Sequence, residues 1–368
     1  MALKKPLDYS LFVAIIFLLC FGLVMLYSAS SYEAQINELP SYYYLLRQAA
    51  FVAAGFLAMM FISIIDFRFW AKLAPIGYLF ALALIILVLT PVGHKVAGAQ
   101  RWIELPGGFS FQPVEFAKIA VIVYLANLIS KLRRPIDKIS TLAGIILRIL
   151  PLLLLVVFGT NNLSSAIIIF AIVIIMLFVS SPKYLQFIMA GLLGVAAVAF
   201  VVFNTGFRSG RIDAWKNPEA SDQGYQVLQA LYAIGSGGVF GKGLGNSVQK
   251  LGFVPEVQND MIFSIICEEL GLFGAIGLIL LFSFMLWRFL VIASQTENLF
   301  GSFLVIGIMA HVAVQVILNI AVVTNSIPNT GVTLPFISSG GTAVMFLLIE
   351  MGLALSVSRS MIKENDLR

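Results

Sequence analysis

The feature of this sequence that most constrains its fold is a series of apolar runs, each about 20 residues long, along almost the whole chain. An α-helix of that length crosses the ~30 Å hydrocarbon core of a lipid bilayer. The runs do not alternate between apolar and polar residues as barrel strands do, so helices are expected. Because 60% of the 368 residues are hydrophobic and only 11% are charged, a water-soluble fold could not hide the apolar surface. The sequence predicts an all-α, polytopic membrane protein.

About ten transmembrane helices are predicted, within a single membrane domain of residues 1–368. They cover Tyr9–Ser30, Leu45–Ile65, Leu73–Thr90, Pro113–Ile129, Leu142–Phe158, Leu163–Val179, Tyr184–Asn204, Met261–Phe289, Leu299–Val323 and Gly341–Ser358. In the fifth of these helices a charge and a proline interrupt the apolar run at 148–151, and we expect that helix to be broken or re-entrant there.

Positively charged residues predict which way the chain faces, because short cytoplasmic loops are enriched in Lys and Arg. With the N-terminus inside, the residues on the cytoplasmic side are Lys4, Lys5, Arg68, Lys72, Lys131, Arg133, Arg134, Lys138, Lys183, Arg288, Arg359, Lys363 and Arg368. Both termini are then cytoplasmic, and the long connections 91–112, 205–260 and 324–340 face outward. The largest of them, 205–260, joins spans seven and eight, and chemistry is expected on this outer side.

The positions of the charged residues argue against a nucleic-acid partner, and the positions of His and Cys argue against a metal site. Although the net charge is +5, Lys and Arg are distributed between the spans rather than gathered in one patch, so no nucleic-acid partner is expected. The two histidines are far apart in the sequence, and Cys20 and Cys267 are isolated, which gives no metal-site signature. Both cysteines are expected to be small buried hydrophobic residues.

Three ionisable residues lie near the outer ends of predicted spans. Asp260 directly precedes the eighth span, where a carboxylate is most often a helix N-cap but can also be a general base with a raised pKa. Glu115 and Lys118 are three residues apart in the fourth span, so they share one helix face and can pair. An ionisable pair at that depth indicates either a functional site or a structural ion pair.

Two outward-facing segments carry further candidate ligand contacts. Arg101 beside Trp102 is typical of an interfacial anchor, or of a contact to a lipid head group or a sugar face. Gly235–Gly243 resembles a phosphate-binding loop but lacks its first glycine and its Ser/Thr. We therefore expect a turn that lets the backbone approach a ligand or a neighbouring helix, with Lys242 and Lys250 as anion contacts.

Polar residues inside the later spans are expected to face protein. His311, Gln315 and Asn319 recur every four residues and form one stripe in the ninth span, which indicates interhelical hydrogen bonds. At least one of the adjacent Glu268 and Glu269 must also point away from lipid.

Several stretches, taken together and in order, resemble the SEDS family (shape, elongation, division and sporulation proteins), which includes RodA, FtsW and SpoVE. They are Gly98–Ile103, Gln112–Lys118, Gly235–Gly245, Pro255–Phe263, Glu268–Gly271 and Thr330–Ser338. Each stretch alone is weak, but the ordered set covers nearly the whole chain and is specific. The last stretch is more similar to the FtsW and SpoVE branch. Asn161-Asn162 stands where the family commonly has Pro-Asp, and Ser339 replaces a usual Tyr.

The resemblance implies a peptidoglycan glycosyltransferase that polymerises lipid II, a disaccharide-peptide on undecaprenyl pyrophosphate, at the outer face of the bacterial cytoplasmic membrane. It also implies a class B penicillin-binding protein (a transpeptidase) and other divisome or elongasome membrane proteins as partners. The family aspartate that matches Asp260 is catalytic, and the residues that match Trp102, Glu115 and Lys118 are linked to activity. Ser338, in the last matching stretch, is expected to support the site.

We hypothesise that Asp260 deprotonates the 4-hydroxyl of the acceptor sugar, which attacks the anomeric carbon of the lipid-linked donor with inversion. The leaving pyrophosphate needs positive charge. The candidates are Arg101, Lys118, Arg208, Arg211, Lys242 and Lys250, with or without a divalent cation (Mg²⁺ or Mn²⁺). A lipid II flippase or transporter, and a catalytically silent scaffold, are the alternatives.

Overall fold

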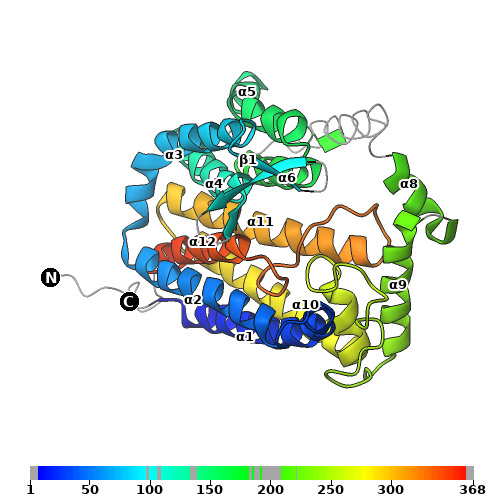
Figure 1. Cartoon of the computed structure of the whole chain (residues 1–368). Coiled ribbons are helices and arrows are strands. Elements are labelled where there is room, and N and C mark those ends of the chain that lie inside the picture. The colour runs from blue at the N-terminus through cyan, green and yellow to red at the C-terminus, as the bar shows by residue number, and fades with distance from the viewer. Residues whose placement is uncertain are drawn as a thin grey trace.

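The computed structural model of the chain describes residues 7–96, 99–105, 109–132, 139–181, 185, 191–192, 209–220 and 222–361. These residues are mainly helical, as the sequence predicts (Figure 1). The helices are α1 (Tyr9–Ile36), α2 (Tyr43–Ile64), α3 (Phe67–Val88), α4 (Pro113–Lys131), α5 (Ile139–Leu154), α6 (Leu163–Val179), α8 (Ser209–Lys216), α9 (Asp222–Gly237), α10 (Ile262–Ser294), α11 (Leu299–Val323) and α12 (Thr342–Ser358).

The helices identify the chain as a multi-pass membrane protein. Among the described residues, seven helical segments are long and apolar enough to cross a bilayer: α1, α2, α3, α4, α5 with the turn that follows it, α10 and α11. The apolar helices α6 and α12 are shorter, at 17 residues each. Each of these nine elements lies where a span is predicted, and α6 and α11 have the predicted bounds. The predicted span Tyr184–Asn204 lies almost entirely outside the described residues.

The predicted break in the fifth span is wrong. Helix α5 continues through Arg148 and Pro151, and the irregularity comes one turn later, as the π-helical turn Leu155–Gly159. Proline removes only its own N–H bond from the helical ladder, and the rest of the ladder holds the helix together. The carbonyl of Arg148 also accepts a hydrogen bond from the Tyr78 hydroxyl of α3 at 2.6 Å, so a neighbouring helix stabilises the part of α5 that contains the proline.

A small antiparallel sheet occupies part of the connection 91–112, and the sequence did not predict it. Strands β1 (Gly93–Val96), β2 (Ala99–Leu105) and β3 (Phe109–Phe111) lie in the order β1-β2-β3. The register pairs His94 with Trp102 and Ile103 with Phe111. Three such short strands carry little pattern of their own, and their pairing places Arg101 and Trp102 on a fixed surface.

The glycine-rich segment is confirmed as a close approach of two backbones. Gly271 interrupts α10 with φ 66° and ψ −164°, and a Cβ built there would lie 2.3 Å from the backbone nitrogen of Gly241. A Cβ on Gly241 would in turn lie 2.2 Å from the carbonyl oxygen of Glu269. The N–H groups of Lys242 and Gly243 donate to the carbonyls of Glu268 and Glu269, both at 2.9 Å. Only glycine fits at such a contact.

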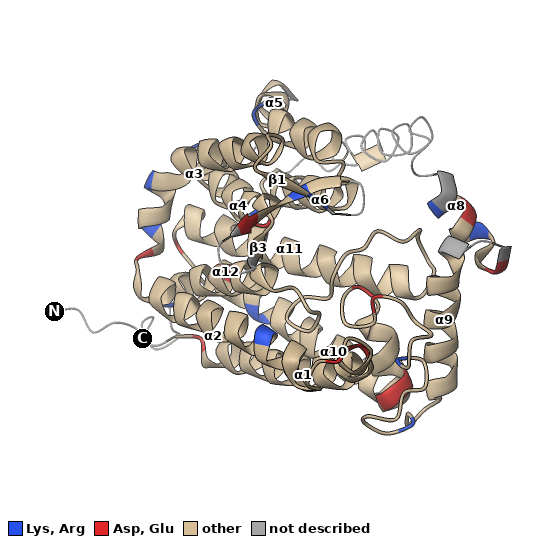
Figure 2. Ribbon diagram, viewed as in Figure 1, with Lys and Arg blue, Asp and Glu red and all other residues tan. Residues whose placement is uncertain are grey.

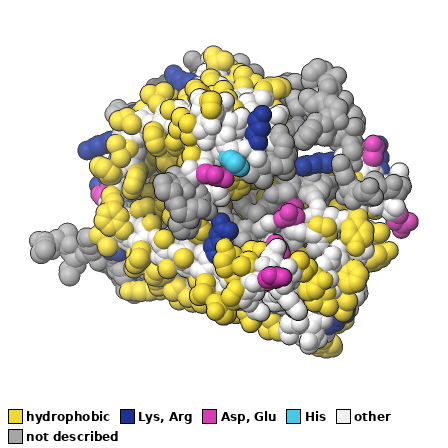
Figure 3. All heavy atoms as spheres, viewed as in Figure 1, with side chains coloured by type: hydrophobic (Ala, Val, Ile, Leu, Met, Phe, Trp, Pro, Cys, Tyr) yellow, Lys and Arg dark blue, Asp and Glu magenta, His cyan; other side chains and the backbone are white. Residues whose placement is uncertain are grey.

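The helical bundle separates the two ends of the molecule. Helices α1, α2, α11 and α12 run across the view of Figure 1, with the start of α1 and the end of α12 on the left and α8 and α9 on the right. Lys, Arg, Asp and Glu are sparse along the bundle (Figure 2). Hydrophobic side chains cover much of the described surface in this view, and charged side chains border a central hollow (Figure 3).

Candidate active site

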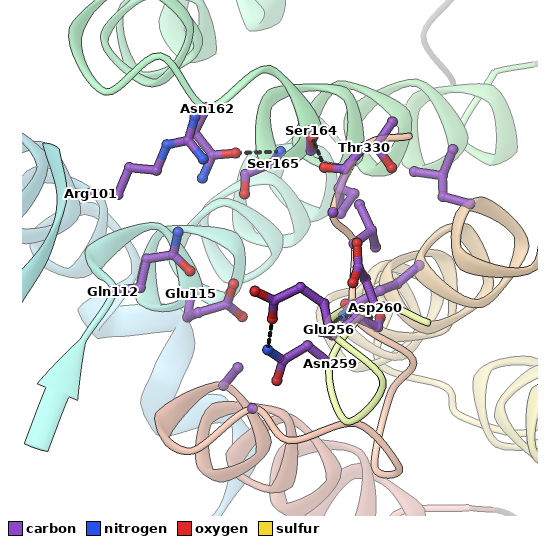
Figure 4. Close-up of a pocket in the computed structure, with 18 of the residues that line it drawn as sticks. Arg101, Gln112, Glu115, Asn162, Ser164, Ser165, Glu256, Asn259, Asp260 and Thr330 are labelled. Carbon is purple, nitrogen blue, oxygen red and sulfur yellow. Dashed lines mark hydrogen bonds between the residues drawn. The ribbon is translucent and has the colours of Figure 1, made fainter. Parts of the chain in front are cut away.

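A cavity of ≈ 870 Å³ collects residues from many separate segments of the chain. Its walls include the first turns of α2, α4 and α6, strand β2, helix α8, and the segments 256–260, 327–333 and 339–343. These segments are far apart in sequence, and the helical bundle brings their ends to one place (Figure 4). The cavity is large enough for a drug-sized ligand, and its lining contains several charged side chains.

Asp260 lies in the wall of this cavity and is only 7% exposed. The side-chain amide of Asn319 donates to its main-chain oxygen at 2.8 Å, which holds the backbone in place. Its carboxyl oxygen Oδ1 has no hydrogen-bond partner among the described residues. The pKa of Asp260 is raised to about 7, chiefly because the carboxyl group is buried; its own backbone N–H and Arg211 act to lower the pKa, and the nearby Glu256 acts to raise it. A carboxyl group in this state can accept a proton at neutral pH.

The N-cap interpretation of Asp260 is wrong. Helix α10 begins at Ile262, its N-cap is Met261, and no side chain caps it. The side chain of Asp260 is therefore not used to close the helix, and it is available to a ligand.

Glu115 and Lys118 form the predicted pair in α4, with 2.8 Å between Oε2 and Nζ. Both line the cavity, and the Lys118 side chain is 2% exposed. Figure 4 shows Glu115 and Glu256 pointing toward one another, from α4 and from the loop before α10. The cavity thus has a carboxylate-rich wall close to one buried ammonium group.

Arg101 and Trp102 also line the cavity, from strand β2. The Arg101 guanidinium donates to the carbonyls of Thr160 and Asn161, at 3.1 Å from Nε and 2.6 Å from Nη2. These two bonds fix the guanidinium next to the start of α6, where Asn162 caps the helix by accepting from Ser165 N–H at 3.1 Å. The structure therefore brings Asp260, Glu115, Lys118, Arg101 and Trp102 together, as predicted.

Two further arginines line the cavity. Arg211 of α8 donates from Nη1 to the carbonyl of Asn329 at 3.2 Å. Arg47 is an exposed residue in the second turn of α2, and it was not predicted from the sequence. A cation just inside the outer end of a predicted span was the signal that could have identified it. Arg208 lies outside the described residues.

Lys242, Lys250 and Ser338 do not line the cavity, so the structure does not support their predicted contact with substrate. Lys242 lies 2.6 Å from Glu268, and Lys250 lies 2.8 Å from Glu269. Both carboxylates are fully buried, and a buried charge needs a close counter-charge. The Ser338 hydroxyl accepts from the Leu334 N–H at 2.8 Å and closes a turn.

The polar stripe of α11 makes hydrogen bonds, as expected. His311 Nδ1 lies 2.8 Å from a carboxylate oxygen of Glu350 on α12, which is an interhelical pair. Gln315 and Asn319 instead bond the loop after α11, through the carbonyls of Thr333 at 3.1 Å and Val332 at 2.7 Å. This stripe therefore anchors the cavity wall as well as joining two helices.

Comparison with known proteins identifies relatives over the whole chain. A family model described as "Cell cycle protein", for FtsW, RodA and SpoVE, matches residues 9–363. Stage V sporulation protein E of Bacillus subtilis (strain 168) is 38% identical over 359 residues, 97% of this chain and 98% of that protein. A probable peptidoglycan glycosyltransferase FtsW of Trichlorobacter lovleyi is 38% identical over 366 residues, 97% of this chain and 95% of that protein.

Solved structures with the same fold cover the chain equally well. The rod shape determining protein RodA of Thermus thermophilus has a TM-score of 0.74 at 26% identity, over 98% of this chain and 99% of that one. A chain from a study of how a peptidoglycan synthase complex coordinates polymerization and crosslinking has a TM-score of 0.80, with the same identity and coverage.

Proposed function

Because this chain belongs to the FtsW, RodA and SpoVE family and is a peptidoglycan glycosyltransferase, we propose that it polymerises lipid II in the cavity described above, with Asp260 as the general base. The observation that carries the proposal is the Asp260 carboxyl group, which is buried, unpartnered at Oδ1 among the described residues, and raised in pKa to about 7. A general base works best when its pKa lies near the pH at which it operates.

The reaction balances as an inverting substitution. Asp260 takes the proton of the acceptor 4-hydroxyl, whose oxygen forms a bond to the anomeric carbon of the lipid-linked donor. The bond from that carbon to the pyrophosphate oxygen breaks, and its electron pair leaves with the pyrophosphate. Lys118, Arg211, Arg101 and Arg47 line the same cavity and would stabilise the charge that develops on this leaving group.

The proposed orientation has the cavity opening to the outer side of the membrane and both termini in the cytoplasm. The positive-inside distribution of Lys and Arg supports it. The start of α1 and the end of α12 lie at the opposite end of the molecule from α8 and α9 (Figure 1), and Arg211 of α8 lines the cavity. A class B penicillin-binding protein is the proposed partner, since the similar synthase complex couples polymerization to crosslinking.

We propose that any Mg²⁺ or Mn²⁺ used in the reaction arrives on the substrate pyrophosphate. Among the described residues, no group of three or more His, Cys, Asp or Glu side chains could hold a metal ion. Mg²⁺ commonly binds through one or two carboxylates together with substrate phosphates. Titration of the substrate-free protein with Mn²⁺ should then give no tight binding, and tight binding would contradict this proposal.

The test is polymerisation of labelled lipid II by the purified protein reconstituted in vesicles. Asp260→Asn should abolish the glycan ladder, because the amide cannot accept the hydroxyl proton. Asp213→Asn makes the same chemical change on the exposed side of α8, away from the cavity lining, and should retain activity. Long strands made by the Asp260→Asn variant would refute the assignment. Transfer of lipid II between leaflets without polymer would favour the flippase alternative.

A further inference from the structure

Three oxygen atoms on residues that line the cavity are buried and have no hydrogen-bond partner among the described residues. They are Oδ1 of Asp260, Oε1 of Gln315 and Oγ1 of Thr330. Asp260 and Gln315 are each 7% exposed, so more than nine-tenths of each residue is shielded from solvent. A buried polar atom without a partner costs free energy, and native structures rarely keep one without a reason.

The three residues belong to one patch of the cavity wall. Gln315 and Asn319 are one helical turn apart on α11 and hold the adjacent residues Thr333 and Val332. Asn319 also bonds the main chain of Asp260. A Cβ built on Gly331, between Thr330 and Val332, would lie 3.9 Å from Oδ2 of Asp260.

The orientation of the Gln315 amide is fixed by its partner. Its nitrogen Nε2 lies 3.1 Å from the Thr333 carbonyl oxygen, which can only accept a hydrogen bond. The nitrogen and not the oxygen must therefore face Thr333. Oε1 is then left as a pure acceptor on a rigid helix, and the group that satisfies it must be a donor.

We propose that Gln315 is a substrate-binding residue, whose Oε1 accepts a hydrogen bond from an O–H or N–H of the acceptor sugar beside Asp260. The inference rests on the proposed function and assigns the second contact of that site. A sugar ring that carries hydroxyl groups and an acetamido group offers donors at adjacent carbons. One donor would face Asp260 and its neighbour would face Gln315.

The contact would restrict how the acceptor can bind. Asp260 alone accepts from any hydroxyl that reaches it, whereas two acceptors at fixed positions select a particular pair of donors. A site built to bond a substrate donor discriminates strongly against an analogue that lacks that donor.

The test measures binding of lipid II separately from turnover, in the Asp260→Asn background where substrate is not consumed. Adding Gln315→Met removes the acceptor oxygen, together with the bond from Nε2 to Thr333, at nearly constant size and should weaken the Kd for lipid II by about tenfold. Gln249→Met is the matched control, because Gln249 also has an unpartnered Oε1 but lies outside the cavity lining. It should leave the Kd unchanged.

A series of lipid II analogues, each lacking one hydroxyl or the acetamido N–H of the acceptor sugar, keeps the proposal testable even if Gln315→Met folds poorly. The protein with Gln315 intact should lose about tenfold in affinity for one analogue other than the 4-deoxy compound, and the Gln315→Met variant should not discriminate against that analogue. Equal losses in both proteins for every analogue would overturn the inference. Polymerisation by Asp260→Asn would instead overturn the proposed function, whatever the binding data show.

Discussion

The pKa of Asp260 makes a quantitative prediction about how polymerisation depends on pH. The proposed base must be ionised, and its pKa is raised to about 7 in the free protein, chiefly by burial. A single group with that pKa is about 9% ionised at pH 6 and about 91% ionised at pH 8. The value of kcat/KM should therefore rise about tenfold between these two pH values and level off above them.

Two neighbours of Asp260 shift its pKa in opposite directions, and each shift predicts the direction in which a variant should move the pH profile. Glu256 raises the pKa of Asp260, so Glu256→Gln should move the rise in kcat/KM to lower pH. Arg211 lowers that pKa, so Arg211→Gln should move the rise to higher pH. Titration of the substrate pyrophosphate affects the pH profile equally in the wild-type protein and in both variants. Differences between the three profiles therefore come from the enzyme.

The assay is the initial rate of strand formation at low lipid II concentration, between pH 5 and 9, in detergent solution. Unchanged circular dichroism and unfolding temperature across this range would show that the protein stays folded. A flat profile between pH 6 and 8 would refute the role of Asp260 as a base with this pKa. Shifts of the two variants in the same direction would refute the electrostatic reasoning.

Three further predictions concern stability. His311→Leu leaves Glu350 buried without its partner and should cost about 3–5 kcal/mol of unfolding free energy, measured by thermal unfolding in detergent, while His311→Leu with Glu350→Leu should recover most of the loss. Gly271→Ala should cost at least 1–3 kcal/mol, because its backbone is left-handed and the added Cβ meets another backbone, and a wild-type unfolding temperature would contradict that contact. Lys250→Met removes the cation that pairs with Glu269 and should lower the free energy of unfolding by about 3–5 kcal/mol in the same assay. A second change, Glu269→Met, should restore stability if the pair is purely structural.

The transmembrane helices could be predicted because lipid imposes a length and a composition on each one. Helix α11 begins and ends at the predicted residues, since polar residues flank its apolar run on both sides. Helix α1 instead continues six residues past Ser30 to Ile36, because a helix can extend beyond the hydrocarbon once its backbone is satisfied internally.

The site was only partly predictable, because hydrogen-bond partners come from distant segments. Glu115 and Lys118 were paired correctly since both lie on one helix. Lys242 and Lys250 looked like free cations, because nothing local shows that Glu268 and Glu269 lie against them. Arg47 was overlooked for the converse reason: its place in the cavity wall depends on how α2 packs against distant parts of the chain.

The Asn319 side chain donates its hydrogen bond to the main-chain oxygen of Asp260 and not to the carboxyl group. Position 260 is thereby anchored independently of the chemistry that we propose for its side chain. An amide at this position would preserve the architecture of the cavity while halting turnover, so the enzyme could be held with both substrates bound. Such an arrested complex would be a direct route to imaging how the two sugars meet.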